Sequence, residues 1–450
     1  MYNLMFTPDR TAKKPVYEQL YEFIAQLIRA GELSEGERLP SKKALAAHLG
    51  ISVNTVETAY GILADEGYVR AKSRSGHYVR RAELPPYESP HLDAERTEKK
   101  VYGTDFKTNA VDSAAFPYST WIRLMREVMY SHPEYMSGGE MKGDRELRES
   151  IAKYLHEFRG VVCSPSQIVI GAGLEYLIML LAQLSRESSI IAIEDPGYKK
   201  AAMIFKNGGR EVRYIGVDSG GLRVDELEKS GSSIVYVTPS HQFPTGFVMP
   251  ADRRAELLAW ADGSEGRYII EDDYNSEFNF SKRPVRAMQA YGERVIYIST
   301  LSRVIAPSIR VAYMVLPKRL LTLFEQRFGA YAPTVPRYEQ HTLARFISDG
   351  YFSRHIARMK MLYGKKRTRL LGILEAAGFE VSGCIGLHAV VRTPAAKEII
   401  RRAKENGIRL CDMDDYYFER EGPHDSLIIG YAGSSEADMQ TLERFFRRAL

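Results

Sequence analysis

From about residue 104 to residue 450, short runs of aliphatic residues alternate with longer amphipathic stretches. The apolar runs include the segments SQIVIGAG, SSIIAIEDPGY, SSIVYVTPS, GRYIIEDDY and RVIYIST. Strands that read as continuous apolar runs are buried on both faces, and strands separated by helical patterns are joined by crossover helices. The alternation therefore predicts an α/β domain with a mainly parallel sheet that helices cover on both sides.

Length and composition narrow the class of protein further. At 450 residues the chain is too long for one ordinary core, so we expect two or more domains. The three cysteines lie far apart with no CxxC spacing, which predicts neither a disulfide framework nor a zinc site. The first ten residues lack the pattern of a signal peptide, and no apolar run approaches the roughly 20 residues that span a bilayer. We therefore expect a cytoplasmic protein without a bound metal.

Residues 1–81 have a different pattern, which predicts a small helical domain that ends in a basic hairpin. Apolar residues recur at helical spacing in residues 15–29, and the segment KKALAAHLG predicts a short second helix that ends at Gly50. A third helix follows, with Ser52 as its N-cap. Residues 82–103 are polar and charged and contain proline, which predicts a linker between two domains.

Two helices joined by a tight glycine-containing turn and followed by a hairpin make a winged helix-turn-helix, whose third helix enters the DNA major groove. Short hydrogen-bonding side chains on that helix suit base edges or phosphates, and basic side chains in the hairpin suit the phosphate backbone. The predicted DNA-binding residues are Ser41, Lys42, Lys43, Ser52, Asn54, Thr55, Thr58, Arg70, Lys72 and Arg74, with Arg80 and Arg81 adding charge. The alternative is a small helical domain with an ordinary solvated basic face, which composition alone favours.

The segment GERLPSKKALAAHLGISVNTVETAYGILADEGYV, residues 36–69, resembles the DNA-binding domain of the GntR family of regulators. The resemblance covers nearly the whole N-terminal domain and implies that this domain binds double-stranded DNA. Val53 departs from the pattern, because many family members carry an arginine before the Asn-Thr pair. The loss of that arginine would remove a phosphate or base contact, so the resemblance does not carry over an operator sequence.

Four segments of the larger domain carry groups with chemical meaning. The segment IEDDYNSEF ends an apolar strand and places Asp272, Asp273 and Tyr274 at its carboxyl end, where ligands of open α/β sheets collect. A buried carboxylate there can hold a proton on a pyridine-type nitrogen, and a tyrosine hydroxyl can reach a phenolic oxygen. The same residues also fit an ordinary polar strand end, which is the commoner case.

The other three segments also have two interpretations each. The segment IVIGAGLEYLIMLL predicts a strand, a glycine turn and a helix, and the N-terminus of such a helix can bind phosphate. In EDPGY, Tyr198 follows a tight turn, where it would stack on a planar ring or merely fill a gap. The segment TPSHQFPTG is a proline-containing loop after a strand, which suits the lip of a site or a simple connection.

Taken in order, these segments resemble the fold-type I aminotransferases, which bind pyridoxal phosphate. Together with STLSRVIAPSIRVAY, residues 299–313, they resemble more closely the MocR/GabR subfamily, in which a linker joins a GntR-type winged helix to an aminotransferase-like domain. The resemblance extends over essentially all 450 residues and includes residues 138–155 and 386–391. It implies that residues 104–450 form one aminotransferase-like domain with a smaller C-terminal subdomain, and that the protein is a homodimer.

The resemblance also implies a set of cofactor contacts. Asp272 would pair with the pyridine nitrogen, Tyr274 with the 3-oxygen of the ring, and Tyr198 would stack on the ring. The residues that would approach the phosphate are Thr300, Ser302 and Arg310, together with the backbone of the glycine turn that ends at Gly173. Arg303 falls where the family has the lysine that forms a Schiff base with the cofactor.

Three positions depart from the aminotransferase pattern. Arg303 is the first, because Schiff-base formation needs a neutral amine, whereas the guanidinium of arginine stays protonated and forms no stable imine. Leu174 replaces a hydroxyl residue that contacts the phosphate, and Ile428 replaces the arginine that holds the substrate carboxylate. We therefore expect no covalent attachment of pyridoxal phosphate, while non-covalent binding of a planar anion or vitamer stays open.

The sequence therefore predicts a DNA-binding transcription regulator that dimerises and senses a small anionic metabolite or vitamer without catalysis. Arg303 could still donate hydrogen bonds to a phosphate or carboxylate of that ligand. One alternative is a pyridoxal-phosphate-dependent aminotransferase with a regulatory appendage, which Arg303 argues against. Another is a ligand-free dimerisation scaffold whose pocket is filled by Arg303 and Leu174.

Overall fold

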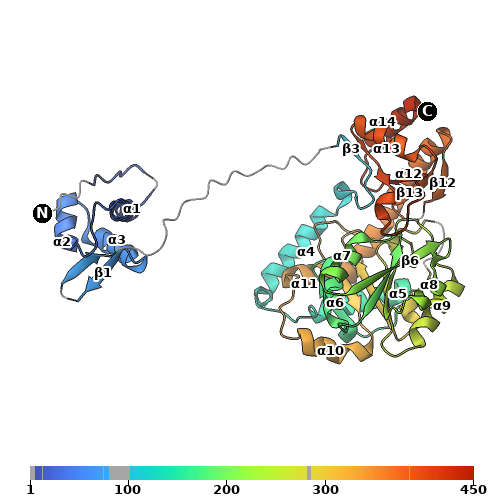
Figure 1. Ribbon diagram of the computed structural model, residues 1–450, viewed down its shortest axis with the longest axis horizontal. Helices are drawn as coiled ribbons and strands as arrows, with labels where there is room; N and C mark the ends of the chain where they lie inside the picture. The colour runs from blue at the N-terminus through green and yellow to red at the C-terminus, as the bar shows by residue number, and fades with distance from the viewer. Residues whose placement is uncertain are drawn as a thin grey trace. The chain divides into compact units, whose positions relative to one another are not determined.

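A computed structural model describes residues 6–12, 14–73, 75–80, 102–280, 285–384 and 386–449. The chain divides into two compact units, residues 1–99 and residues 100–450 (Figure 1). Each unit has a hydrophobic core of its own. The predicted DNA contact Arg74, the predicted charge Arg81 and most of the predicted linker, residues 82–101, lie outside the described residues.

The smaller unit has the three helices and the hairpin that the sequence predicts. Its elements are α1 (Val16–Arg29), α2 (Lys42–Leu49), α3 (Val53–Asp65), β1 (Val69–Lys72) and β2 (Gly76–Val79), and the two strands pair antiparallel. Gly50 ends α2 in the left-handed conformation, with φ 61°, and the Ser52 side chain accepts a hydrogen bond from the backbone N–H of Thr55 at the start of α3. The end of α2 at Gly50 and the N-cap of α3 at Ser52 were both correctly predicted, because each depends only on local backbone chemistry.

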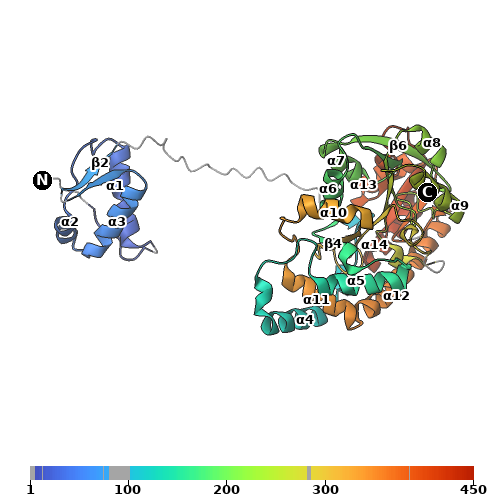
Figure 2. The ribbon, with the colours of Figure 1, turned by 90° about the horizontal axis from the view of Figure 1, so that it is seen from below.

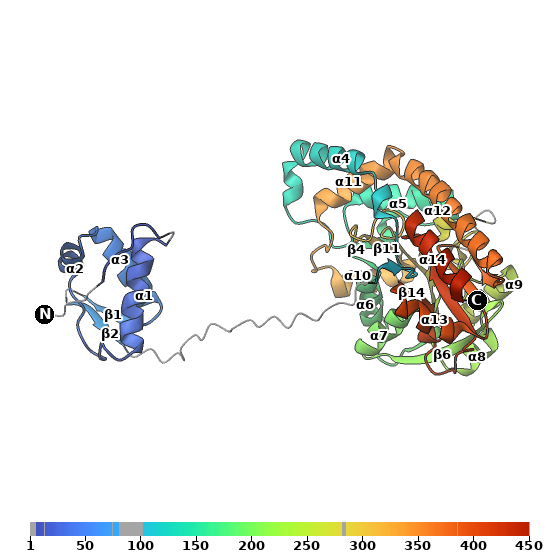
Figure 3. The same cartoon turned by 90° about the horizontal axis from the view of Figure 1, so that it is seen from above.

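The core of this unit lies between α1 and α3, which run side by side in Figure 3. Leu20 and Ile24 of α1 and Val56, Tyr60 and Leu63 of α3 are completely buried. These residues recur three or four positions apart, so they lie on one face of each helix. The remaining face of α3 is exposed and carries most of its polar side chains.

The larger unit is built on an eight-stranded sheet in the order β4-β11-β10-β9-β8-β5-β6-β7. The strands are β4 (Ile168–Gly171), β5 (Ile190–Asp195), β6 (Glu211–Asp218), β7 (Gly221–Leu222), β8 (Ile234–Val237), β9 (Tyr268–Asp272), β10 (Val295–Thr300) and β11 (Ala312–Val315). The pairs β10–β9, β9–β8, β8–β5 and β5–β6 are parallel, whereas β11 is antiparallel to both of its neighbours and β7 is antiparallel to β6. The prediction of a mainly parallel sheet is confirmed.

Helices cover both faces of this sheet (Figure 2). One face is covered by α6 (Leu174–Leu184), α7 (Lys199–Asn207) and α10 (Lys318–Phe328), whose apolar side chains share a core with alternate residues of the strands. The other face is covered by α5 (Arg145–Arg159), α8 (Val224–Lys229), α9 (Ala251–Asp262), α11 (Arg337–Ser348) and α12 (Tyr351–Ala376), with α4 (Tyr118–Ser131) packed against α11. Burial on both faces explains why the strands read as unbroken apolar runs.

A smaller subdomain at the C-terminal end has its own antiparallel sheet in the order β12-β13-β16-β15. Its elements are β12 (Glu380–Gly383), β13 (His388–Arg392), α13 (Ala396–Glu405), β15 (Cys411–Asp412), β16 (Ser426–Gly430) and α14 (Glu436–Ala449). A short parallel pair joins β14 (Ile408–Arg409) to β3 (Thr104–Asp105). Single 3-10 turns lie at Ser113–Ala115, Pro133–Met136, Pro165–Gln167, Ser276–Phe278, Met288–Ala290 and Asp414–Tyr416. Among the described residues, no helix combines the length and apolarity that crossing a bilayer requires.

Candidate functional site

A cavity of about 170 Å³ opens at the carboxyl edge of the parallel strands in the larger unit. All the cofactor-contact residues predicted from the sequence line it, namely Gly173, Tyr198, Asp272, Tyr274, Thr300, Ser302, Arg303 and Arg310. They come from five different strand ends, which the parallel arrangement brings to one edge of the sheet. The sheet therefore assembles in one place residues that lie up to 137 positions apart in the chain.

Asp272, the last residue of β9, is a buried carboxyl with one free oxygen. The hydroxyl of Tyr236 donates a hydrogen bond to Oδ2 of Asp272. Oδ1 is buried and has no hydrogen-bond partner within the described part of the chain. Burial raises the pKa of the Asp272 carboxyl to about 7, against the hydrogen bond from Tyr236. Asp272 can therefore hold or release a proton near neutral pH toward a group placed beside it.

Arg303 occupies the wall next to Tyr274. Its guanidinium carbon lies 5.0 Å from the centroid of the Tyr274 ring, and Nη1 donates a hydrogen bond of 3.2 Å to the carbonyl oxygen of Thr108. Burial raises the pKa of the Tyr274 hydroxyl well above its ordinary value, so the ring under the guanidinium is a neutral phenol. The Tyr274 hydroxyl also lies 3.0 Å from Nδ1 of His241. The Arg303 side chain is thus held in place by protein groups.

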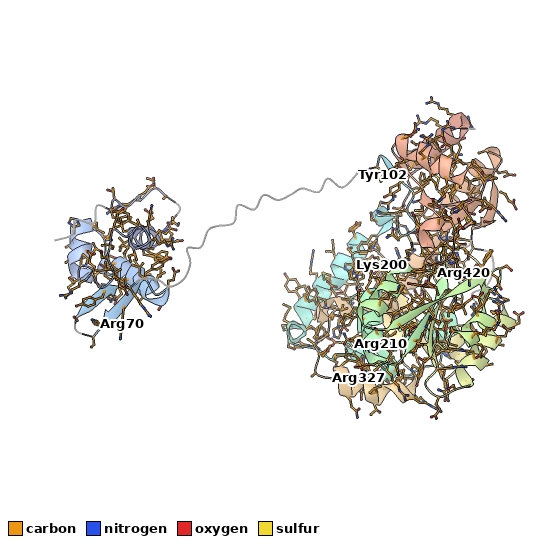
Figure 4. The ribbon with its side chains drawn as sticks, viewed as in Figure 1. Arg70, Tyr102, Lys200, Arg210, Arg327 and Arg420 are labelled. Atoms are coloured by element: carbon orange, nitrogen blue, oxygen red, sulfur yellow. The ribbon has the colours of Figure 1, made fainter. Side chains whose placement is uncertain are left out.

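The opposite end of the cavity surrounds the N-terminus of α6. Gly173 has φ 99°, and a β-carbon there would lie 2.5 Å from Nη2 of Arg310, so the close approach of Arg310 requires glycine. Oε2 of Glu175 lies 3.1 Å from Nη2 of Arg310, and Oε1 lies 3.2 Å from Nζ of Lys200 (Figure 4 labels Lys200). Partial burial opposes ionisation of Glu175, yet hydrogen bonds from its own backbone N–H, Lys200 and Arg310 hold its pKa below the ordinary value. A carboxylate of the chain itself therefore pairs with both cations and offsets one of their two positive charges.

The two hydroxyl residues of the loop after β10 are engaged within that loop. Oγ1 of Thr300 accepts a hydrogen bond of 3.2 Å from the backbone N–H of Ser302. The Ser302 hydroxyl donates a hydrogen bond of 2.7 Å to the carbonyl oxygen of Ile309. The Thr300 hydroxyl also donates to the carbonyl oxygen of Val311 at 3.5 Å, so both hydroxyl hydrogens are used within the loop and only lone pairs of the two oxygens are left for other groups.

Aromatic rings form the remaining wall. Tyr198 immediately precedes α7, and its ring lies edge-to-face with that of Phe243, 6.4 Å between centroids. The Phe243 ring is also edge-to-face with that of Tyr274, at 6.0 Å. Thr238 lines the same wall and donates a hydrogen bond of 2.6 Å to Glu194, whose pKa burial raises to about 7. A planar ligand between these rings and Asp272 would contact both apolar surface and a proton-holding group.

The sequence reasoning missed several residues that line the cavity: Asn109, Glu175, Lys200, Thr238, Phe243 and Pro307. Glu175 and Lys200 lie within two positions of Leu174 and Tyr198, so charged neighbours of the predicted residues were an available signal. Asn109 comes from the opposite end of the unit in sequence, and nothing local marks it. Ile428 is completely buried in β16 and packs with Val390 and Met413.

In the smaller unit, most of the predicted DNA contacts lie around the start of α2, along α3 and on β1. Ser41 is the N-cap of α2 and Ser52 is the N-cap of α3, while Lys43, Asn54 and Thr58 are exposed. Lys42 forms an ion pair of 2.6 Å with Glu57 of α3. Arg70 and Lys72 project from β1, where Arg70 is labelled in Figure 4. Thr55 is half-buried, and its hydroxyl lies 2.8 Å from that of Ser52.

Comparison with known proteins gives the same two-part division. The model of the family "Bacterial regulatory proteins, gntR family" matches residues 16–79, and that of "Aminotransferase class I and II" matches residues 104–444. The chain is 38% identical to the uncharacterized HTH-type transcriptional regulator YdeL of Bacillus subtilis, over 96% of both chains. It is 32% identical to the probable rhizopine catabolism regulatory protein MocR of Rhizobium meliloti, over 97% of this chain and 94% of that one. It is 29% identical to the pyridoxine biosynthesis regulator PdxR of Corynebacterium glutamicum, over 93% and 92%.

Solved structures resemble the larger unit. An archaeal alanine:glyoxylate aminotransferase superposes with a TM-score of 0.69 at 21% identity, covering 78% of this chain and 92% of that one. The kynurenine aminotransferase of Pyrococcus horikoshii superposes with a TM-score of 0.67 at 22% identity, with the same coverage. At this identity the likeness shows the fold alone.

Proposed function

This chain belongs to the MocR/GabR subfamily of GntR-type transcription regulators, and we propose that its aminotransferase-like domain binds a small planar anion without covalent chemistry. The observation that carries the proposal is the position of Arg303. By the family resemblance it takes the place of the Schiff-base lysine, and its guanidinium lies over the ring of Tyr274 and donates a hydrogen bond to Thr108. The regulator therefore keeps the cavity of an aminotransferase and lacks the amine on which its reaction depends.

The cavity fits the ring of pyridoxal phosphate but not its covalent attachment. The free Oδ1 of Asp272 suits a ring nitrogen that carries a proton, and Tyr198 and Phe243 supply flat apolar surface. When bound to a lysine, this cofactor withdraws electrons from a substrate carbon. No such bond can form to the guanidinium of Arg303. Lys200 is another basic group that lines the cavity, and it is paired with Glu175.

The name of the relative PdxR supports a vitamer of the pyridoxine class as the ligand. Such a molecule offers a ring nitrogen to Asp272 and a ring hydroxyl to Tyr274. A carboxylate or phosphate on it would meet Arg303 at one end or the Arg310–Lys200 pair at the other. The proposal therefore names a planar heterocycle that carries one negative charge or more.

Calorimetric titration of the full chain tests this proposal. Pyridoxal phosphate, pyridoxal, pyridoxine and pyridoxine phosphate form the panel, and Asp272→Asn serves as the variant that loses proton transfer at the cavity. We expect saturable binding of pyridoxal phosphate or pyridoxine phosphate, weaker binding of pyridoxal and pyridoxine, which lack the phosphate, and weaker binding of the phosphates to Asp272→Asn. Absence of heat for the whole panel, together with an unchanged melting temperature, would favour a ligand-free scaffold. The internal pairing of Glu175 with Arg310 and Lys200 is the observation that supports that second possibility.

For the assembled protein, we propose a homodimer formed through the larger unit. α4 exposes the apolar side chains Tyr118, Ile122, Met129 and Tyr130 on its surface, which is unusual for a helix that faces only water. Two copies would also present two DNA-binding units to two half-sites. Sedimentation equilibrium of the wild type and of an Ile122→Asp variant tests the interface, and we expect the variant to dissociate at higher concentration than the wild type.

A further inference from the structure

The exposed face of α3 has an apolar side chain where a polar one is expected. Val53 is the first residue of α3, and 43% of its surface is exposed. An isolated exposed valine is common on protein surfaces, but this one lies at the end of the recognition helix that enters the major groove. Because of this position, the apolar character of Val53 affects which DNA sequence the helix recognises.

The polar groups around Val53 are mostly engaged within the unit. Ser52 Oγ accepts the backbone N–H of Thr55 at 3.0 Å, and the Thr58 hydroxyl donates to the carbonyl oxygen of Asn54 at 3.0 Å. Glu57 is ion-paired with Lys42. Ser52 and Thr58 were predicted as direct contacts, and their hydroxyl hydrogens or lone pairs are already in use within the helix. This leaves fewer groups to distinguish one base pair from another.

Two exposed side chains at this end of α3 keep their full recognition capacity. The side-chain amide of Asn54 makes no hydrogen bond to any residue that the structure describes, and 43% of the surface of Val53 is exposed. In the major groove, an asparagine amide matches the edge of adenine, and an apolar group matches the 5-methyl group of thymine. Valine can donate no hydrogen bond to guanine or to a phosphate. Apposition to the polar edge of a G·C pair would desolvate that edge without compensation.

We infer that Val53 is a specificity-determining residue that reads the 5-methyl group of one thymine in each operator half-site. The arginine that many GntR-type domains carry at this position would instead donate to guanine or to a phosphate. The substitution therefore changes both the base that is preferred and the salt dependence of binding, because one cation fewer faces the DNA.

In the first step of the test, the full-length protein selects duplexes from a randomised pool, and one selected duplex serves as the probe. In the selected duplex, each thymine is replaced in turn by deoxyuridine, which removes only the methyl group. For the wild type, we expect one thymine per half-site at which this replacement weakens binding about fourfold. For Val53→Ala, the same replacement should weaken binding less than in the wild type, because alanine keeps only one methyl group for the contact.

Two further variants distinguish a change in base recognition from a general loss of binding by a misfolded protein. Val53→Arg should select duplexes with guanine in place of that thymine and should bind with a steeper salt dependence. Asp65→Asn, at the exposed last residue of α3, should leave the thymine-to-deoxyuridine effect unchanged. The inference is overturned if no thymine shows an effect that depends on Val53, or if Val53→Arg selects the same base as the wild type.

Discussion

Arg303 stacks its guanidinium on the ring of Tyr274, with 5.0 Å between the guanidinium carbon and the ring centroid. A neutral tyrosine face attracts a cation, and this contact is stronger where water is excluded, as it is around the buried Tyr274. Arg303 is therefore a packed part of the cavity wall and not an unfavourable replacement for lysine. Its guanidinium packs on the Tyr274 ring and donates a hydrogen bond to the carbonyl oxygen of Thr108.

Replacement of Arg303 by lysine should restore the capacity for covalent attachment of pyridoxal phosphate. The shorter amine would face Asp272 and Tyr274, and a lysine can lose its proton near a cationic or apolar surface. We expect Arg303→Lys to give a new absorbance band with pyridoxal phosphate that borohydride reduction makes permanent, and the wild type to give none. Transamination should stay absent, because Leu174 and Ile428 are unchanged.

The control for this experiment is Lys200→Met, since Lys200 is a second basic side chain in the cavity. A wild-type band that disappears in Lys200→Met would show covalent capture by Lys200. A wild-type band that survives in Lys200→Met would contradict the role given to Arg303. Mass spectrometry of the reduced protein identifies the modified residue in either case.

Removal of the Glu175 carboxylate should strengthen anion binding. In the wild type, an incoming phosphate or carboxylate must compete with Glu175 for Arg310 and Lys200. All three side chains are partly exposed, so we expect Glu175→Gln to bind inorganic phosphate only about fivefold more tightly than the wild type. Titration calorimetry measures the change. Glu149→Gln is the matched control, because Glu149 pairs with Arg145 on α5 away from the cavity. Equal affinities for the wild type and Glu175→Gln would show that Glu175 does not compete.

The carboxyl of Asp272 should make stability fall as the pH rises through the weakly acidic range. Its pKa is about 7 in the folded protein and about 4 in the unfolded chain, so between these values the folded state binds more protons. Stability of the wild type relative to Asp272→Asn should therefore decline from about pH 4 to about pH 7 and then level off. Urea denaturation of both proteins below, within and above this window measures the difference. A difference that stays constant with pH would show that the pKa of Asp272 is the same in the folded protein and in the unfolded chain.

Loss of the Ser52 side chain should loosen the start of α3. Its Oγ satisfies the backbone N–H of Thr55, and removal of such an N-cap costs about 1 kcal/mol. In Ser52→Ala we expect the first amides of α3 to exchange with solvent about fivefold faster than in the wild type. Hydrogen exchange of the full chain measures this, and Ser52→Asn, which can also cap, should restore the wild-type rate. Equal exchange in Ser52→Ala and the wild type would contradict the capping role.

The sequence indicated the elements well because their signals are local. Ser52 and Gly50 mark helix ends through backbone hydrogen bonds and a left-handed turn, and the aliphatic runs mark strands that are covered on both faces. The position of β11, antiparallel between β4 and β10, could not be inferred in this way. Strand order depends on which crossovers pack together, and an apolar run such as RVAYMV has the same pattern in either direction.

The sequence predicted only some of the residues that line the cavity, for a related physical reason. Residues such as Asp272 and Tyr198 were predicted because they follow apolar strands, where ligands of α/β sheets collect, and because the family resemblance assigns cofactor contacts to them. Glu175 was missed because its importance depends on where its side chain points, toward Arg310 and Lys200, and side-chain direction is set by tertiary packing. Asn109 and Thr108 were missed because they reach the cavity from a segment with no motif of its own.

The hydrogen bond from Arg303 to Thr108 also has a mechanical consequence. Thr108 lies in the stretch between β3 and α4, close to residue 102, where the described part of the larger unit begins. A ligand that drew the guanidinium toward itself would remove this hydrogen bond, while the neighbouring backbone stays held by the pairing of β3 with β14 and by the hydrogen bond from the N–H of Phe106 to the carbonyl oxygen of Arg409. Arg303 therefore joins the segment that precedes α4 to the wall of the cavity, so that a ligand bound there would act on both.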